Sequence, residues 1–161
     1  VGGIMLTSSH NPAEYLGVKL RMNDGGAAGK EFTDRVEAAF ADAPADARGA
    51  FETVDLMTPY LATLKERVDV EAIRNANLRV VVDPLYGAGR IYLAQLLRDL
   101  GVEVCEINNA EDPTFDGLHP EPIPPWVDRC IAKVPSWVTT PASSTTATLT
   151  ASARLTSAAT S

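Results

Sequence analysis

The sequence predicts an α/β fold, and three observations lead to that prediction. Apolar runs flank a leucine-rich helical stripe in residues 78–107, which is the pattern of a βαβ unit with parallel strands. A second pair of apolar runs, in residues 2–22, flanks a short polar loop. Residues 136–161 carry one charge, Arg154, and consist mainly of Thr, Ser and Ala. That composition predicts a disordered tail behind the folded part.

The first predicted elements are two strands joined by the polar loop. Residues 2–6 form an apolar run that we expect to be a buried strand, and residues 15–22 form the returning strand, with Gly17 near its start. A tight connection between them brings Lys19 back beside Ser9. Because an amine then neighbours a hydroxyl, the loop is a candidate for nucleophilic chemistry.

Helices are predicted between this hairpin and the βαβ unit. Phe32, Val36 and Phe40 recur at i, i+4 and i+8, and a small-residue linker follows over residues 41–49. A second apolar stripe runs from Met57 to Val68, in which Pro59 is tolerated in the first turn.

The second half alternates helices and strands. The elements expected are a helical turn, a strand, a helix ended by Gly101, a strand and a last helix, at residues 70–76, 78–82, 91–100, 102–107 and from 124 onward. In the last helix we expect Val127 and Ile131 to face the core.

Composition excludes several functional classes. The chain has 161 residues, 45% of them hydrophobic, which suffices for one ordinary domain or two small ones. Its net charge is -7 and its cations are not clustered, so nucleic acid is not an expected partner. Cys105 and Cys130 lack metal-ligand spacing and suggest no disulfide framework. With no signal peptide or long apolar span, no membrane partner is expected and the expected location is cytoplasmic.

The segment Thr7-Ser8-Ser9-His10-Asn11-Pro12, followed by Tyr15, Gly17 and Lys19, carries a family resemblance. It resembles the active-site serine loop of the phosphohexomutases, the phosphoglucomutase/phosphomannomutase family, with Ser8 where that family usually has Ala. Residues 78–89 are similar to the opening strand and turn of the family's second domain. Phe115-Asp116-Gly117 and Pro120-Glu121-Pro122 are similar to its later loop. Order and spacing agree over residues 2–135.

The resemblance implies a domain organisation. Residues 1–56 correspond to the C-terminal part of a first phosphohexomutase domain with the serine loop, and residues 57–135 to most of a second α/β domain. The family has four domains around a cleft, so we expect this chain to be a fragment, cut at its front, with residues 136–161 as its tail.

The resemblance also implies an activity. The parent enzyme is an isomerase of carbohydrate metabolism that moves a phosphoryl group between C1 and C6 of a hexose phosphate. It does so through a phosphoserine and a hexose 1,6-bisphosphate. Ser9 takes the role of the phosphoserine, Lys19 that of a base or charge partner, and His10 orients groups or shuttles a proton. Asn11 is a minor candidate for substrate binding.

The family's cofactor is Mg²⁺, which touches the phosphoserine oxygen, here on Ser9, and is held by three aspartates. Those aspartates are absent from this chain. A frameshift in the coding sequence near Pro135 would account for their absence. Codons that encode Thr145 to Ala151 can, in a neighbouring reading frame, encode Asn-Asp-Gly-Asp-Ala-Asp-Arg, which resembles the family's metal-binding loop. Without the metal and the missing domains, the isolated chain is expected to be inactive.

Three alternatives compete with the mutase interpretation. The chain could be a non-catalytic phosphosugar-binding or interaction module. A Ser/His hydrolase is disfavoured, because adjacent Ser9 and His10 would not face each other on an extended segment and no Gly-x-Ser-x-Gly motif occurs. Asp112, Asp116 and His119 could form a metal cluster, but the prolines and glycine among them favour a turn-rich loop.

Overall fold

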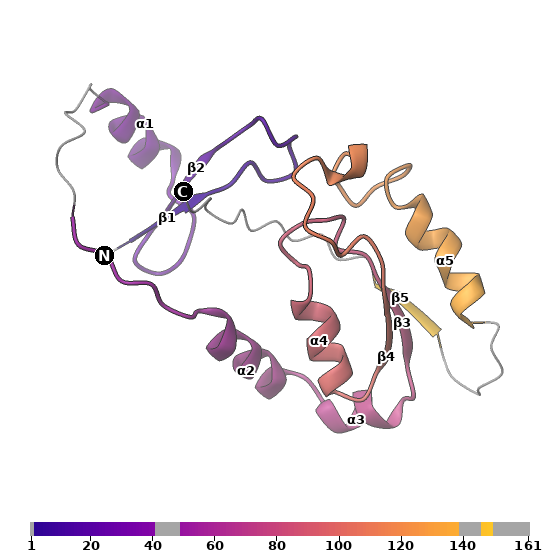
Figure 1. The fold of residues 1–161 in the computed structure, drawn as a ribbon. Helices are drawn as coiled ribbons and strands as arrows, with labels where there is room; N and C mark the ends of the chain where they lie inside the picture. The colour runs from indigo at the N-terminus through magenta and orange to yellow at the C-terminus, as the bar shows by residue number, and fades with distance from the viewer. Residues whose placement is uncertain (1, 41–48, 139–145, 150–161) are drawn as a thin grey trace.

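The computed structural model describes residues 2–40, 49–138 and 146–149 of the chain. The N-terminal part is a hairpin of two antiparallel strands, β1 (Gly3–Leu6) and β2 (Val18–Arg21), in which Met5 lies opposite Lys19. The helix α1 (Lys30–Ala38) follows. Figure 1 shows this part at one end of the molecule.

Gly17 is required where the hairpin loop closes. The backbone N–H groups of Thr7 and Gly17 donate to each other's carbonyl oxygens, at N–O distances of 2.9 and 3.1 Å. A Cβ atom at Gly17 would lie 2.7 Å from the Thr7 carbonyl oxygen, which no side chain tolerates. The glycine therefore allows Lys19 to return beside the loop.

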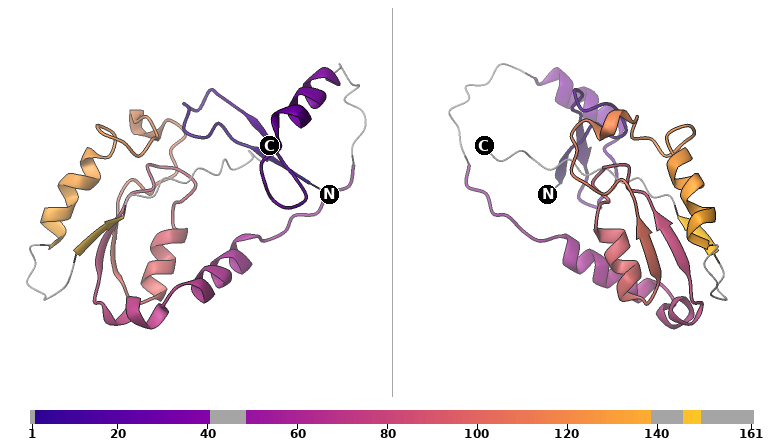
Figure 2. Two further views of the ribbon diagram at one scale, coloured as in Figure 1. Left: turned by 180° about the vertical axis from the view of Figure 1, so that it is seen from behind. Right: turned by 45° about the vertical axis from the view of Figure 1, so that its right-hand side comes forward.

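The larger part is an α/β unit. Its elements after α1 are α2 (Met57–Arg67), α3 (Val70–Asn75), β3 (Arg79–Val82), α4 (Tyr92–Asp99), β4 (Glu103–Glu106), a 3₁₀ turn over Phe115–Gly117, α5 (Asp128–Val138) and β5 (Thr146–Leu149). The strands form a parallel sheet in the order β4-β3-β5. Helices α4 and α5 lie on opposite sides of this sheet (Figures 1 and 2).

The core lies around β3, whose four residues are all buried. Val80 and Val82 pack with Leu97 of α4 and with Val102. Cys130 of α5 is buried, and so is Val127 just before the helix. Ile131, which the sequence pattern placed toward the core, is 55% exposed, so that prediction is wrong.

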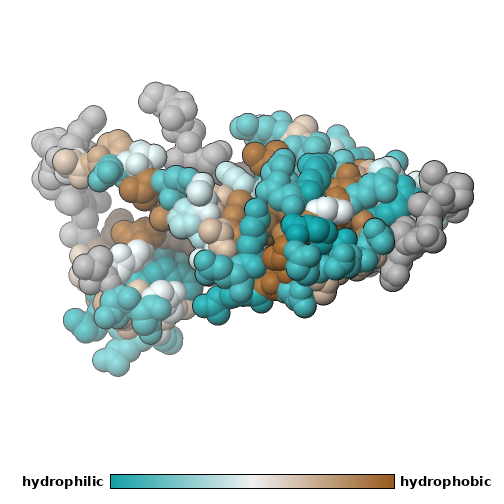
Figure 3. All heavy atoms as spheres, turned by 90° about the horizontal axis from the view of Figure 1, so that it is seen from below, coloured by the Kyte–Doolittle hydropathy of each residue, from teal (hydrophilic) through white to brown (hydrophobic). Residues whose placement is uncertain are grey.

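The hairpin differs from the prediction in its burial. Both strands occur where they were expected, but every residue of β1 is exposed, and Ile4 is 72% exposed. The described part contains two strands of this sheet, and their side chains Leu6 and Val18 are exposed as well. Seen from below, hydrophobic side chains reach the surface of the molecule at several places among hydrophilic ones (Figure 3).

The predicted tail overlaps with regular structure. Residues 136–138 complete α5, and residues 146–149 form β5, which pairs with β3 in parallel. Thr-rich segments are also compatible with strands, so the composition of the tail did not exclude this pairing. The remaining tail residues, and part of the segment on which the frameshift interpretation depends, lie outside the described residues.

Candidate functional site

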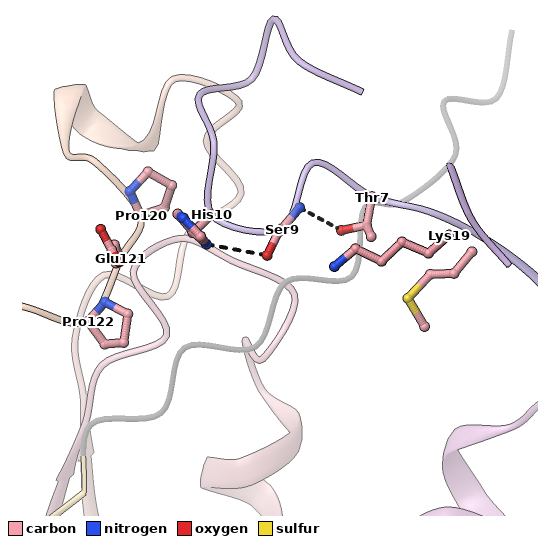
Figure 4. Close-up of a pocket in the computed structure, with 8 residues that line it drawn as sticks. Thr7, Ser9, His10, Lys19, Pro120, Glu121 and Pro122 are labelled. Carbon is pink, nitrogen blue, oxygen red and sulfur yellow. Dashed lines mark hydrogen bonds between the residues drawn. The ribbon is translucent and has the colours of Figure 1, made fainter. Parts of the chain in front are cut away.

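The predicted site residues Ser9, His10 and Lys19 lie together. They line a pocket of about 310 Å³, which we call the serine pocket, whose lining residues are Met5, Thr7, Ser9, His10, Lys19, Pro120, Glu121 and Pro122. Its walls come from the hairpin and from the loop that precedes α5. Figure 4 shows Lys19 and His10 on opposite sides of Ser9, with Pro120 and Pro122 beyond the imidazole.

Ser9 is positioned by local backbone structure. Its φ is 58°, in the left-handed region, and its N–H donates to the hydroxyl oxygen of Thr7 at 3.0 Å. The Asn11 N–H donates to the Ser8 carbonyl at 3.0 Å and closes the turn that contains Ser9. Thr7 and Ser8 are buried, whereas Ser9 is half-buried, so the turn presents the Ser9 hydroxyl at the surface of a fixed loop.

Ser9 and His10 face each other, contrary to the expectation from an extended segment. The Ser9 Oγ lies 3.3 Å from the His10 Nδ1. The physical reason is the positive φ of Ser9, which breaks the alternation of side-chain directions along a strand. A hydroxyl so placed can pass its proton to the imidazole when it attacks an electrophile.

Lys19 reaches the same pocket from β2. It lies opposite Met5 in the hairpin register, so both side chains emerge on the face that lines the pocket. Its ammonium runs back toward Ser9 in Figure 4. A cation at this position can stabilise negative charge on a group bound to the serine.

Asn11 is exposed and is not among the residues that line the serine pocket. Its backbone N–H makes the contact to Ser8 that shapes the turn.

Sequence reasoning missed Glu121 and its flanking prolines as part of this site. Glu121 is the one carboxylate among the lining residues, and Pro120 is buried. The segment was recognised only as a loop, because contact between residues more than a hundred positions apart leaves no local periodicity. The Pro-Glu-Pro pattern itself, a stiff loop with one charge, was the available signal.

The three residues considered as a metal cluster have separate partners. Asp112 accepts hydrogen bonds from Thr114 and from the Asp116 N–H, and these contacts hold the pKa of the Asp112 carboxyl below its ordinary value, with the Thr114 hydroxyl contributing most. Asp116 pairs with Arg129 at 2.7 Å. His119 instead faces Glu121. Among the described residues, no group of three His, Cys, Asp or Glu side chains could hold a metal ion.

Comparison with known protein families gives two matches that follow one another along the chain. Residues 1–79 match the model of phosphoglucomutase/phosphomannomutase, alpha/beta/alpha domain I. Residues 58–145 match the model of phosphoglucomutase/phosphomannomutase, alpha/beta/alpha domain II.

Individual relatives agree with these matches. The chain is 40% identical over 126 residues to the phosphoglucomutase/phosphomannomutase of Thermococcus kodakarensis, covering 75% of this chain and 28% of the relative. It is 29% identical over 134 residues to the phosphoglucosamine/phosphogalactosamine mutase of Sulfurisphaera tokodaii, with the same coverage. The chain therefore spans little more than a quarter of the length of these curated relatives.

A solved structure gives the same result for the fold. The crystal structure of a protein from Thermus thermophilus, described as a phosphomannomutase, superposes with a TM-score of 0.81 at 33% sequence identity. The superposition covers 94% of this chain and 34% of the other.

Proposed function

Because the chain belongs to the phosphoglucomutase/phosphomannomutase family, we propose that Ser9 carries a phosphoryl group in a phosphohexomutase reaction. In this reaction Ser9 donates its phosphoryl group to one hydroxyl of a hexose phosphate, which forms a hexose 1,6-bisphosphate. The serine then takes back the phosphoryl group from the other position. The observation that carries the proposal is the 3.3 Å contact between the Ser9 hydroxyl and the His10 imidazole, inside a pocket that Lys19 also lines.

Each proposed role follows from the position of the side chain. When Ser9 Oγ attacks the phosphorus of a bisphosphate, the bond from phosphorus to the sugar oxygen breaks. The O–H bond of the serine breaks as well, and His10 Nδ1 receives that proton, while the departing sugar oxygen takes up a proton from solvent and becomes a hydroxyl of the hexose phosphate. Lys19 places positive charge beside the phosphoryl oxygens, where phosphoryl transfer develops and redistributes negative charge. Thr7 keeps the serine backbone in its turn.

Mg²⁺ enters the proposal in one respect only. When bound, the ion would neutralise charge on a phosphoryl oxygen of phosphorylated Ser9. The described residues do not supply the carboxylate set that would hold it. The steps above therefore depend on His10 and Lys19.

The proposal extends to organisation, partners and location. We assign residues 1–56 to part of domain I and residues 57–135 to an incomplete domain II, and the start of α2 at Met57 supports this division. The partners are a hexose phosphate and its bisphosphate, and the proposed location is the cytoplasm, because such charged sugars do not cross a bilayer unaided. No helix in the described part of the chain is long and apolar enough to cross a bilayer.

The test is transfer of labelled phosphate from glucose 1,6-bisphosphate to the chain in the presence of Mg²⁺, with the modified residue located by mass spectrometry. A complete mutase cycle is not expected of this chain alone, but the single transfer to Ser9 depends only on His10 and Lys19, which line the same pocket. We therefore expect label on Ser9 and none in Ser9→Ala. The matched control is Ser8→Ala, which removes the neighbouring hydroxyl and should leave labelling of Ser9 in place. Binding without any labelled residue, unchanged in Ser9→Ala, would instead support a non-catalytic phosphosugar-binding module.

A further inference from the structure

The chain contains two histidines, and the structure brings them into contact. His10 belongs to the loop after β1, and His119 to the loop that precedes α5. Their ring centroids lie 6.3 Å apart with an interplanar angle of 77°, an edge-to-face arrangement. Two loops distant in sequence therefore meet through their only imidazoles.

His119 is itself held from two further sides. Its Nε2 lies 3.5 Å from a carboxylate oxygen of Glu121, and its ring centroid lies 5.8 Å from that of Trp126. The neighbouring Pro120 is buried, and proline restricts the backbone on this side of the ring. His119 is thus a half-buried, packed ring rather than a loose loop side chain.

His10, by contrast, is exposed, and its contact with Ser9 is at the long end of the hydrogen-bond range. A hydrogen bond of this kind between exposed groups contributes little net free energy, since water competes for both partners. Side-chain rotation would move Nδ1 away from the serine unless another contact restricts the ring. The edge-to-face packing with His119 is such a contact.

We propose that His119 is a positioning residue that holds the His10 imidazole against Ser9. The proposal rests on the proposed function for its significance, because a fixed His10 matters only if Ser9 transfers its proton there. The Ser9–His10 geometry itself can be measured without any substrate. His119 need not touch the sugar phosphate to have this effect.

The measurement is the long-range ¹H–¹⁵N spectrum of the imidazoles, which contains only two histidines and can be assigned with single variants. The ¹⁵N shift of His10 Nδ1 in the wild type, compared with Ser9→Ala, reports the hydrogen bond from the serine. We expect His119→Leu, which fills the space without a ring, to lose at least half of that difference. We expect His119→Phe, which keeps an aromatic ring, to retain most of it.

Labelling of Ser9 gives the second readout. Misplacement of a reacting group by about 1 Å can cost up to a hundredfold in rate, so we expect roughly tenfold slower labelling in His119→Leu and less than about a twofold change in His119→Phe. Circular dichroism checks that each variant folds. If His119→Leu does not fold, Glu121→Gln, which weakens the contact that orients His119, should move the Nδ1 shift in the same direction.

The two proposals can fail separately. An unchanged His10 Nδ1 shift in a folded His119→Leu overturns the positioning role, even if Ser9 is labelled. Absence of label on wild-type Ser9 overturns the proposed function. In that case the positioning role would still be supported if His119→Leu reduced the difference in His10 Nδ1 shift between chains with Ser9 and with Ser9→Ala.

Discussion

Ser9 adopts a backbone conformation that costs a residue with a side chain about 1–2 kcal/mol relative to the right-handed region. Its φ of 58° persists because the hydroxyl of Thr7 accepts its N–H and because the Asn11 N–H closes the turn. Such strain is concentrated at functional sites. Here its consequence is specific, since it turns the hydroxyl toward the neighbouring imidazole.

Asp83 is a second residue whose environment is unusual. It is completely buried at the carboxyl end of β3, and it accepts hydrogen bonds from the Leu85 N–H at 2.9 Å and from the Asn108 side-chain amide at 3.0 Å. Burial raises the pKa of Asp83 above its ordinary value of 3.8, against the opposing effect of these hydrogen bonds and of the nearby Arg129 charge. The carboxylate thus joins the ends of β3 and β4.

This raised pKa predicts how stability depends on pH. Between 3.8 and the raised pKa, the folded state holds a proton on Asp83 that the unfolded state has lost. The contribution of Asp83 to stability is therefore full below pH 3.8 and is lost as pH rises through the folded-state pKa. We expect the Asp83→Asn variant to gain stability relative to the wild type over that interval, measured by urea unfolding at a series of pH values.

The control for Asp83 is Asp34→Asn, an exposed position in α1 that pairs with Lys30. This variant makes the same carboxyl-to-amide change at a solvent-exposed site, where an ion pair contributes little to stability. A stability difference for Asp83→Asn that is constant with pH, or that falls as pH rises, would contradict the assignment.

At the scale of elements, the βαβ unit could be predicted from sequence. Strands expected at 78–82 and 102–107 occur as Arg79–Val82 and Glu103–Glu106, and the helix expected at 91–100 occurs as Tyr92–Asp99. The prediction succeeded because β3 is buried on both faces and α4 on one, so burial imposes the apolar pattern that the sequence shows.

Contacts between distant loops could not be predicted in this way. Ser9, His10 and Lys19 belong to one hairpin, so their spacing alone places them together. Glu121 and His119 reach the same site from a loop whose path depends on how α5 packs. The positive φ of Ser9 likewise depends on a turn that local propensity does not specify.

Arg79 and Glu103 link the neighbouring strands β3 and β4. Two hydrogen bonds, of 2.9 and 3.1 Å, join the guanidinium to the carboxylate, and the guanidinium also lies 4.7 Å from the centre of the Trp137 ring. The two partners differ in exposure, since the Arg79 side chain is 7% exposed and that of Glu103 is 54% exposed. Substituting Glu103 should therefore change the free energy of unfolding by a different amount from substituting Arg79.

We expect Glu103→Ala to destabilise the chain by about 2–3 kcal/mol, because it leaves a buried guanidinium without its carboxylate. Arg79→Met should stay within about 1 kcal/mol of the wild type, because methionine can pack against Trp137 and the remaining carboxylate reaches water. Urea unfolding of both variants tests this order. If Arg79→Met destabilised the chain more than Glu103→Ala, the burial of the Arg79 guanidinium would not be the reason that the pair matters for stability.

At the scale of the whole molecule, the site joins two parts of unequal packing. The α/β unit has helices on both sides of its sheet, whereas the described part of the hairpin has two strands with exposed apolar side chains. A two-stranded hairpin is marginally stable in water unless something packs against it. The serine loop is therefore carried by the less stable part.

Hydrogen exchange should reveal this difference directly. We expect amides of β3 to exchange roughly a hundredfold more slowly than those of β1, because β3 opens only with its unit whereas the hairpin opens locally. Equal protection of β1 and β3 would mean that both parts unfold as one.

A ligand that binds only the folded hairpin stabilises it by mass action. On the proposed function, glucose 1,6-bisphosphate should therefore slow hydrogen exchange in β1 and β2 and leave exchange in β3 nearly unchanged. Ser9→Ala, which retains the hairpin register, distinguishes binding from phosphorylation, because protection that survives in this variant needs no covalent bond to the serine.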